Sequence, residues 1–241
     1  MSVAHQMRNR MIVLGIDTSG AACSVALWEN GIVLAKIQKK MMRGHAEALM
    51  PTIQFLFNRA NIGYNDIGLI SVTTGPGSFT GIRVGLATAQ GLSLGLGIPI
   101  CGVTVFEAIG MAAARRIHVK GINKLTVILE TRRTDFFLQE FCIRNSEVIE
   151  AGDPRSASIE SLIANIGKDI YIAGDGVERL KTHLPSPEHV KLVPSCEFPD
   201  SAIVAEIAAK TDSNAYKSAH PFYIHPPLAT LPKKKGRVFN E

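Results

Sequence analysis

The chain has 241 residues, of which 46% are hydrophobic and 20% are charged. These fractions are ordinary for a folded protein, and no apolar run reaches the roughly 18 residues that a membrane-spanning helix needs. The first ten residues are polar and lead into a short apolar stretch that lacks the features of a signal peptide. We therefore expect a cytoplasmic protein and exclude the membrane-protein classes.

The net charge of +5 is concentrated at the two ends of the sequence. Residues 1–10 contribute +2 and residues 232–241 contribute +3, while the 20 basic and 20 acidic residues between them cancel. The folded body is thus not expected to be a basic nucleic-acid-binding surface. The basic C-terminal run is either a solubilising extension or a weak, salt-sensitive attraction to phosphate.

Neither the cysteines nor the histidines predict a metal site. The four cysteines are scattered along the chain: Cys23, Cys101, Cys142 and Cys196. Their spacing fits no zinc motif, and we expect each to be a small buried residue in a reducing compartment. His45 lacks a second histidine one helical turn later, because that position is Leu49. We predict no metal site and no catalytic residue.

The first third of the chain predicts a hairpin followed by alternating helices and strands. Three strands are expected at 11–18, 22–28 and 32–38, helices at 45–61 and 79–94, and further strands at 69–74 and 100–103. Asn30-Gly31 suits a two-residue type I′ turn, because both positions need a positive φ. Pro51 should bend the first helix or displace its start. This order predicts a ribonuclease-H-like lobe over 11–105, the building block of the actin-like ATPase fold.

A weaker repeat of the same order follows in the second half. Helices are expected at 106–117, 158–166 and 202–210, and strands at 125–130, 136–143 and 170–173. We therefore predict an α/β protein with a two-lobed actin-like fold. Its second, shorter lobe should span 106–217, and an extended basic tail should span 218–241.

The first strand ends in Asp17-Thr18-Ser19, where actin-like kinases place an acidic residue for the metal and a hydroxyl turn for phosphates. No lysine or arginine follows within the turn, so a phosphate would lack its usual positive partner. Two interpretations stay open. The segment is either a degenerate phosphate turn or an aspartate that caps the turn through its side chain.

A glycine loop lies between a predicted strand and the helix at 79–94, with the sequence Gly75-Pro76-Gly77-Ser78-Phe79-Thr80. Such a loop at a helix N-terminus can bind an anion through free amides and the helix dipole. It is not a P-loop, since Ile82 replaces the lysine that should follow the last glycine. Alternatively, the glycines let the loop pack close to the sheet.

The helices at 45–61 and 79–94 are predicted to form a partner interface. The second helix carries small residues at helical spacing, which allow another helix to approach although each interior glycine costs about 1 kcal/mol. The interface is assigned to Leu49, Met50, Ile53, Phe57, Gly81, Arg83, Gly85, Thr88 and Leu92. The same patch meeting itself would give a twofold homodimer.

Taken together, these motifs resemble the TsaB (YeaZ) family, densely over 11–110 and loosely beyond. The strongest match is the run from Gly75 to Gly85, supported by the first strand's Ile-Asp-Thr-Ser and by His45-Ala46-Glu47. In the second half, Glu130-Thr131-Arg132 stands where the family has Asp-Ala-Arg. Pro221-Phe222-Tyr223-Ile224-His225 is similar to the family's Pro-x-Tyr-Leu-Arg.

The resemblance implies a non-catalytic scaffold or dimerisation subunit for threonylcarbamoyl transfer to N6 of the adenosine next to the anticodon, in tRNAs that read codons starting with adenine. The implied partners are a catalytic TsaD-type subunit, a TsaE-type ATPase and, indirectly, tRNA, with a homodimer when the chain is alone. No cofactor is expected on this chain, whereas the assembled pathway uses ATP, threonine and bicarbonate-derived threonylcarbamoyl-AMP. The alternatives are an actin-like nucleotide-dependent kinase, for which Gly174-Asp175-Gly176 is only a fragment of the adenosine loop, and a metalloprotease-like hydrolase.

Overall fold

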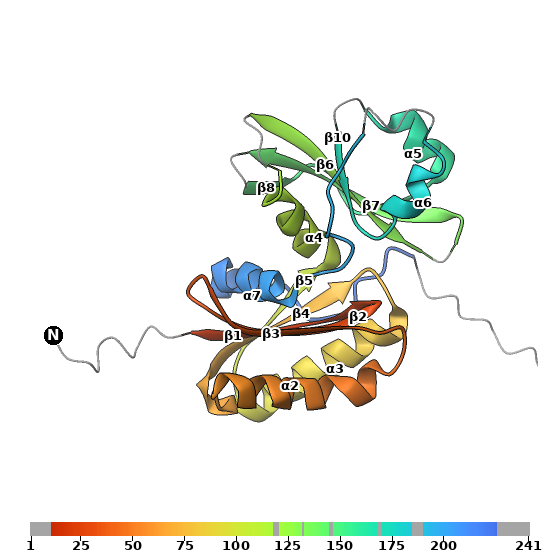
Figure 1. Cartoon of the computed structure of the whole chain (residues 1–241). Coiled ribbons are helices and arrows are strands. Elements are labelled where there is room, and N and C mark those ends of the chain that lie inside the picture. The colour runs from red at the N-terminus through yellow and green to blue at the C-terminus, as the bar shows by residue number, and fades with distance from the viewer. Residues whose placement is uncertain are drawn as a thin grey trace, which may run out of the picture.

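The computed structural model describes residues 11–117, 121–131, 133–144, 147–167, 170–184 and 190–225. These residues form two α/β lobes, each built on one sheet, with the first lobe at the bottom of Figure 1. None of the helices in the described ranges is long and apolar enough to cross a membrane.

The first sheet contains five strands in the order β3-β2-β1-β4-β5. Their bounds are β1 Ile12–Gly20, β2 Ala22–Glu29, β3 Ile32–Lys40, β4 Ile67–Gly75 and β5 Ile100–Thr104. The first three strands are antiparallel, and β1, β4 and β5 run parallel. Asn30 and Gly31 have φ values of 46° and 89°, so the predicted positive-φ hairpin turn is confirmed.

Helices cover both faces of this sheet, which explains why β1 is buried along nearly its whole length. α2 (His45–Ala60) and α3 (Phe79–Leu96) lie side by side on one face, and α7 (Ser201–Lys210) lies on the other (Figure 1). Pro51 lies inside α2, which runs unbroken past it. Of the two expected effects of Pro51, the displacement of the helix start is wrong, because α2 begins at His45 as predicted.

The second sheet repeats the arrangement of the first. Its strands are β6 Ile122–Glu130, β7 Asp135–Arg144, β8 Glu147–Glu150, β10 Ile170–Ala173 and β11 Val190–Leu192, with β9 Arg155–Ser158 also paired to β7. The order β8-β7-β6-β10-β11 starts with three antiparallel strands and ends with three parallel ones, as in the first sheet. The predicted two-lobed, actin-like fold is thus confirmed.

Short helices complete the fold. They are α4 Val105–Ala114, α5 Ile159–Asn165 and α6 Val177–Lys181, and single 3-10 turns lie at Tyr64–Asp66 and Ser213–Ala215. In Figure 1, α4 and α7 lie between the two sheets, and the two helices contact each other.

One predicted lobe boundary needs correction. The helix at 202–210 was assigned to the second lobe at 106–217, but α7 packs on β1 and β2 of the first sheet. Ser24 donates a hydrogen bond to Ser201 at 2.7 Å, and a Cβ on Gly15 would overlap the backbone oxygen of Ser201. The missing side chain of Gly15 lets the start of α7 approach β1, and local sequence does not reveal this long-range pairing.

The first part of the predicted tail at 218–241 packs against the folded body of the protein. Residues 216–225 form a strap between the lobes: Gly102 donates to the carbonyl oxygen of Lys217 and Phe222 donates to that of Thr74, both at 2.8 Å. Phe222 and Ile224 pack against the second-lobe core. The basic run at 232–241 and residues 1–10 lie outside the described residues.

Candidate functional site

Asp17, at the end of β1, is completely buried. Its Oδ1 accepts hydrogen bonds from the Ser19 amide at 3.1 Å, the Ser19 hydroxyl at 2.6 Å and the Thr73 hydroxyl at 2.7 Å. Burial raises the pKa of Asp17, and these hydrogen bonds oppose the rise. The carboxylate thus fastens the first hairpin turn to β4 from inside the protein.

The glycine loop packs against this turn. The Ser78 amide donates to the Ser19 carbonyl oxygen at 2.7 Å, and a Cβ on Gly77 would overlap the same oxygen. The Thr18 hydroxyl donates to the carbonyl oxygen of Gly81 at 2.7 Å. The loop residues 75–80 therefore use their glycines for close backbone packing, as one of the two sequence interpretations expects.

The side chains predicted to form the α2 interface are mostly interior. Leu49 and Ile53 have no exposed surface and Phe57 is 2% exposed, because all three belong to the core under the first sheet. Their assignment to a partner surface is therefore wrong. The apolar stripe of α2 packs on the first sheet, and the apolar stripe of a helix generally faces the protein core.

The predicted glycine face of α3 also points inward. A Cβ on Gly85 would lie 2.5 Å from the Thr18 hydroxyl oxygen, and a Cβ on Gly81 would overlap the Thr18 carbonyl oxygen. These glycines let α3 approach β1, not a second chain, which corrects their assignment. The three remaining predicted residues of this helix are exposed or half-buried: Arg83, Thr88 and Leu92.

Large apolar side chains are nevertheless exposed on the outer surfaces of these helices. On α2, Met50 is 42% exposed and Phe55 is 60% exposed; on α3, Leu94 is 87% exposed. Of these, only Met50 was predicted. Phe55 and Leu94 could have been found from the sequence, because both are apolar residues outside the main apolar stripe of their helix.

A row of small residues runs beside Leu94 on α3. Ala87, Gly91 and Gly95 recur every four residues and are exposed. A Cβ added to Gly91 or Gly95 would meet nothing within 4 Å. We call the outward side of α2 and α3, which carries this row together with Met50, Phe55 and Leu94, the outer helical face. Its glycines serve no close packing within the described residues, in contrast to Gly85.

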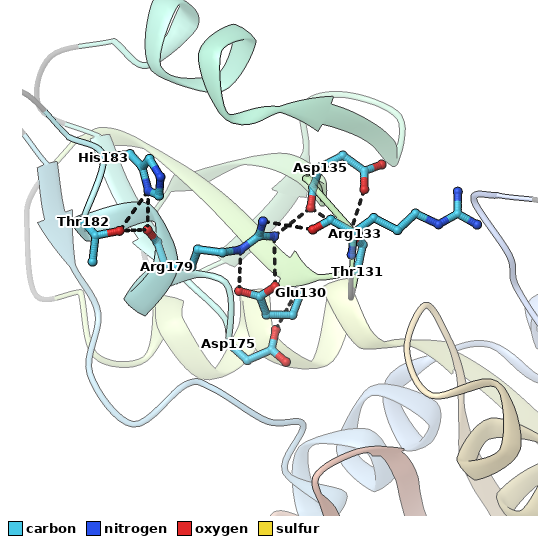
Figure 2. Close-up of polar contacts among 8 residues, drawn as sticks. All are labelled: Glu130, Thr131, Arg133, Asp135, Asp175, Arg179, Thr182 and His183. Atoms are coloured by element: carbon cyan, nitrogen blue, oxygen red, sulfur yellow. Dashed lines mark hydrogen bonds and ion pairs between the residues drawn. The ribbon is translucent and has the colours of Figure 1, made fainter.

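In the second lobe, Arg179 of α6 organises the turn between β6 and β7, as Figure 2 shows. Its guanidinium pairs with both oxygens of Glu130 at 2.9 Å and donates to the carbonyl oxygens of Arg133 and Asp135 at 3.1 and 2.7 Å. Asp175 accepts the Glu130 amide at 2.9 Å. In the second lobe this turn occupies the position of the Asp17 turn in the first, and Arg179 and Glu130 form an ion pair there.

The strap connects that turn to the glycine loop. His225 bonds to Asp135 at 2.8 Å, while Arg83 donates to the Tyr223 hydroxyl at 3.3 Å. The rings of Tyr223 and Phe79 stack at 5.5 Å between centroids. Residues 221–225, which include the Pro-x-Tyr match, thus contact both lobes.

Within the described ranges, no group of three or more His, Cys, Asp or Glu side chains is arranged to hold a metal ion. His45 is 8% exposed, and its Nε2 has no hydrogen-bond partner. Arg132 of the Glu130-Thr131-Arg132 segment lies outside the described residues.

Comparison with protein families gives a match over most of the chain. The family model described as "TsaD: tRNA N6-adenosine threonylcarbamoyltransferase" matches residues 33–220. The tRNA threonylcarbamoyladenosine biosynthesis protein TsaB of Escherichia coli K12 is 34% identical over 131 residues, which cover 54% of this chain and 55% of that protein. The match therefore spans about half the length of this relative.

Further similarities extend over more of the chain. A TsaB of Buchnera aphidicola from Schizaphis graminum is 28% identical over 70% of this chain and 81% of its own length. The solved structure of YeaZ from Pseudomonas aeruginosa superposes with a TM-score of 0.72 at 23% identity, covering 88% of this chain and 99% of that one. The structural likeness agrees with the two-lobed fold.

Proposed function

Because the chain belongs to the TsaB (YeaZ) family, we propose that it is a non-catalytic subunit of the assembly that transfers threonylcarbamoyl to N6 of the adenosine next to the tRNA anticodon. Its relatives carry the name tRNA threonylcarbamoyladenosine biosynthesis protein. In this proposal the chain acts by binding a catalytic TsaD-type subunit, a TsaE-type ATPase joins them, and tRNA is bound through the assembly.

The observation that carries the proposal is the outer helical face. Gly91 and Gly95 each cost about 1 kcal/mol of helix stability relative to alanine, and neither approaches another of the residues that the structure describes. A partner helix lying along Ala87, Gly91 and Gly95 would use that close approach and would cover Leu94 beside the row. In the absence of a partner, two copies of the face would pair into a homodimer.

Two features support a non-catalytic role. Asp17 has no contact with solvent, and the Thr18 hydroxyl and the Ser19 carbonyl are bonded to the Gly75–Gly81 segment. A phosphate or metal ion would have to break these contacts to reach the turn. In this proposal the chain itself binds no cofactor, and ATP, threonine and threonylcarbamoyl-AMP are used by its partners.

Co-purification with the TsaD-type subunit of the same organism tests the proposal, followed by a tRNA modification assay on the reconstituted assembly. Gly91→Leu should abolish co-purification and modification, because its side chain fills the space that a partner helix needs. Ala164→Leu, on the exposed side of α5, is the matched control and should bind normally. Normal binding by both variants would place the interface elsewhere.

The isolated chain gives a second measurement. It should neither hydrolyse ATP nor modify tRNA, and sedimentation should show a dimer that Gly91→Leu converts to a monomer. ATP turnover that Asp17→Ala removes would contradict the non-catalytic role and would favour the kinase alternative.

A further inference from the structure

A groove of about 340 Å³ lies where the first turns of α2 and α3 meet. Its lining includes Arg43, Gly44 and His45 from the start of α2, and Ser78 and Thr80 from the start of α3. The positive ends of two long helices therefore face one cavity. This groove is separate from the row of Ala87, Gly91 and Gly95.

The start of α2 is left without a cap. Gly44 at the N-cap position has φ of 84°, and no side chain accepts a hydrogen bond there. The amides of residues 45–47 have no carbonyl partner within the helix. At α3, by contrast, the Ser78 hydroxyl accepts the Gly81 amide at 3.3 Å. The donors in need of an acceptor thus lie mainly on the α2 side of the groove.

His45 gives an independent indication of a ligand. It lines the groove and is 8% exposed, and its Nε2 is one of only two buried side-chain nitrogen or oxygen atoms in the described residues without a hydrogen-bond partner. The other is Oδ2 of Asp17. A buried polar atom without a partner costs about 1–3 kcal/mol, so a ligand that accepts a hydrogen bond from the His45 ring would be favoured.

We propose that this groove binds a phosphate oxyanion, held by the uncapped amides at 45–47, the Nε2–H of His45 and the guanidinium of Arg43. Hydroxyl groups of Ser78 and Thr80 complete the set of donors on the opposite side. Helix N-termini with free amides bind phosphate in many proteins, and the arginine adds a charge-assisted hydrogen bond. The phosphate is either the free ion or a phosphoryl group of a nucleotide or RNA.

Two carboxylates lie near the proposed ligand and set the limits of its affinity. Glu47 is exposed in the first turn of α2, where its Oε2 would lie 3.7 Å from a Cβ on Gly44, so it competes for the same amides. Asp17 is buried, is held by Ser19 and Thr73, and interacts electrostatically with His45 of the groove. The site is therefore expected to bind phosphate weakly and to gain affinity when Glu47 is neutralised.

The test titrates the full-length chain with inorganic phosphate in a chloride buffer, followed by calorimetry and by phosphorus NMR. Arg43→Gln should weaken phosphate binding about five- to tenfold, and Glu47→Gln should strengthen it. Arg59→Gln, at the opposite end of α2, should leave it unchanged. His45→Leu should also weaken phosphate binding. If this variant does not fold, Arg43→Gln still tests the proposal, because Arg43 is exposed.

Parallel titrations with AMP and with a short RNA oligonucleotide distinguish the sources of the phosphate. Tighter binding of one of these, still sensitive to Arg43→Gln, would identify a nucleotide or an RNA as the ligand. Equal affinities of the wild type, Arg43→Gln and Glu47→Gln for phosphate, or no saturable binding by the wild type, would overturn the proposal. Either result leaves the partner-binding role of the outer helical face intact.

Discussion

The hydroxyl of Thr18 donates a hydrogen bond to the carbonyl oxygen of Gly81, 63 residues later in the chain, at 2.7 Å. This bond joins the first hairpin turn to the first turn of α3. The same hydroxyl oxygen would lie 2.5 Å from a Cβ on Gly85. Thr18 thus explains why two positions of α3 are glycine, because its hydroxyl leaves no room for a Cβ at position 85 and its carbonyl oxygen leaves none at position 81.

The two kinds of glycine in α3 predict opposite effects of the same substitution. Gly85→Ala should destabilise the chain by about 1–3 kcal/mol, because the new methyl group displaces the Thr18 hydroxyl from its bond. Gly91→Ala should stabilise the chain by about 0.5–1 kcal/mol, since the helix gains propensity and nothing is displaced. Urea denaturation of both variants measures this. Equal effects would contradict the assignment of Gly85 to the interior.

Asp175 predicts a pH dependence of stability. Burial, together with the nearby charge of Glu130, raises its pKa from 3.8 to about 6. Since the folded state then binds a proton more tightly than the unfolded state, this group makes the free energy of unfolding fall as the pH rises from 4 to 6. At neutral pH this decrease in the free energy of unfolding is complete.

Asp175→Asn should therefore be more stable than the wild type at pH 7, by up to about 3 kcal/mol, and the difference should vanish near pH 4. The amide oxygen still accepts the Glu130 amide, so the hydrogen bond is kept. Urea denaturation at several pH values measures the effect. If Asp175→Asn is less stable than the wild type at neutral pH, the charge of the Asp175 carboxylate is favourable there. Its attraction to Arg179 of the same cluster would be the reason.

The sequence predicted the parts of the fold that local patterns encode. Asn30-Gly31 specified its turn because few other dipeptides accept two positive φ values. The strand expected at 11–18 was found as β1, because a continuous apolar run is typical of a buried strand. Short elements such as β8 and β11 escaped prediction, because three or four residues carry too little periodicity to indicate a strand.

Most of the residues predicted for the interface lie on the inner sides of α2 and α3, against the protein's own sheet. Leu49 and Gly85 show why: an apolar stripe or a glycine row reports that something packs closely, without identifying it as the protein's own sheet or as a partner. The pairing of Gly85 with Thr18 links positions 67 residues apart, which no local pattern contains. The same limit hid the packing of α7 on the first sheet.

The contact between His225 and Asp135 predicts how firmly the strap is held. Burial alone would raise the pKa of Asp135, but hydrogen bonds from His225 and Thr131 bring it below its ordinary value. The stabilisation is therefore present at neutral pH and is lost as the pH falls below about 4, where the carboxyl protonates. His225→Ala should cost about 0.5–1.5 kcal/mol at pH 7.

Denaturation of His225→Ala at pH 7 and in acid checks this, because the variant and the wild type should converge as Asp135 becomes neutral. His220→Ala is the matched control, since His220 is exposed on the same segment. Proteolysis near residues 216–225 should also accelerate in His225→Ala alone. Equal protease sensitivity of the two variants would show that the strap does not depend on this contact.

Phe55 provides the sharpest separation between folding and partner binding. It is 60% exposed on α2, whereas Phe57, two residues later, is 2% exposed in the core. Phe55→Asp should leave the melting temperature unchanged, because substitutions at exposed positions usually alter stability by less than about 0.5 kcal/mol. It should weaken binding of the TsaD-type subunit by about 2 kcal/mol or more, roughly 30-fold in Kd, if the ring anchors the interface.

Ile122→Asp, at a position 69% exposed in the second lobe, controls for the added charge and should bind normally. Equal weakening by both variants would indicate a general charge effect, and unchanged binding by Phe55→Asp would remove α2 from the interface.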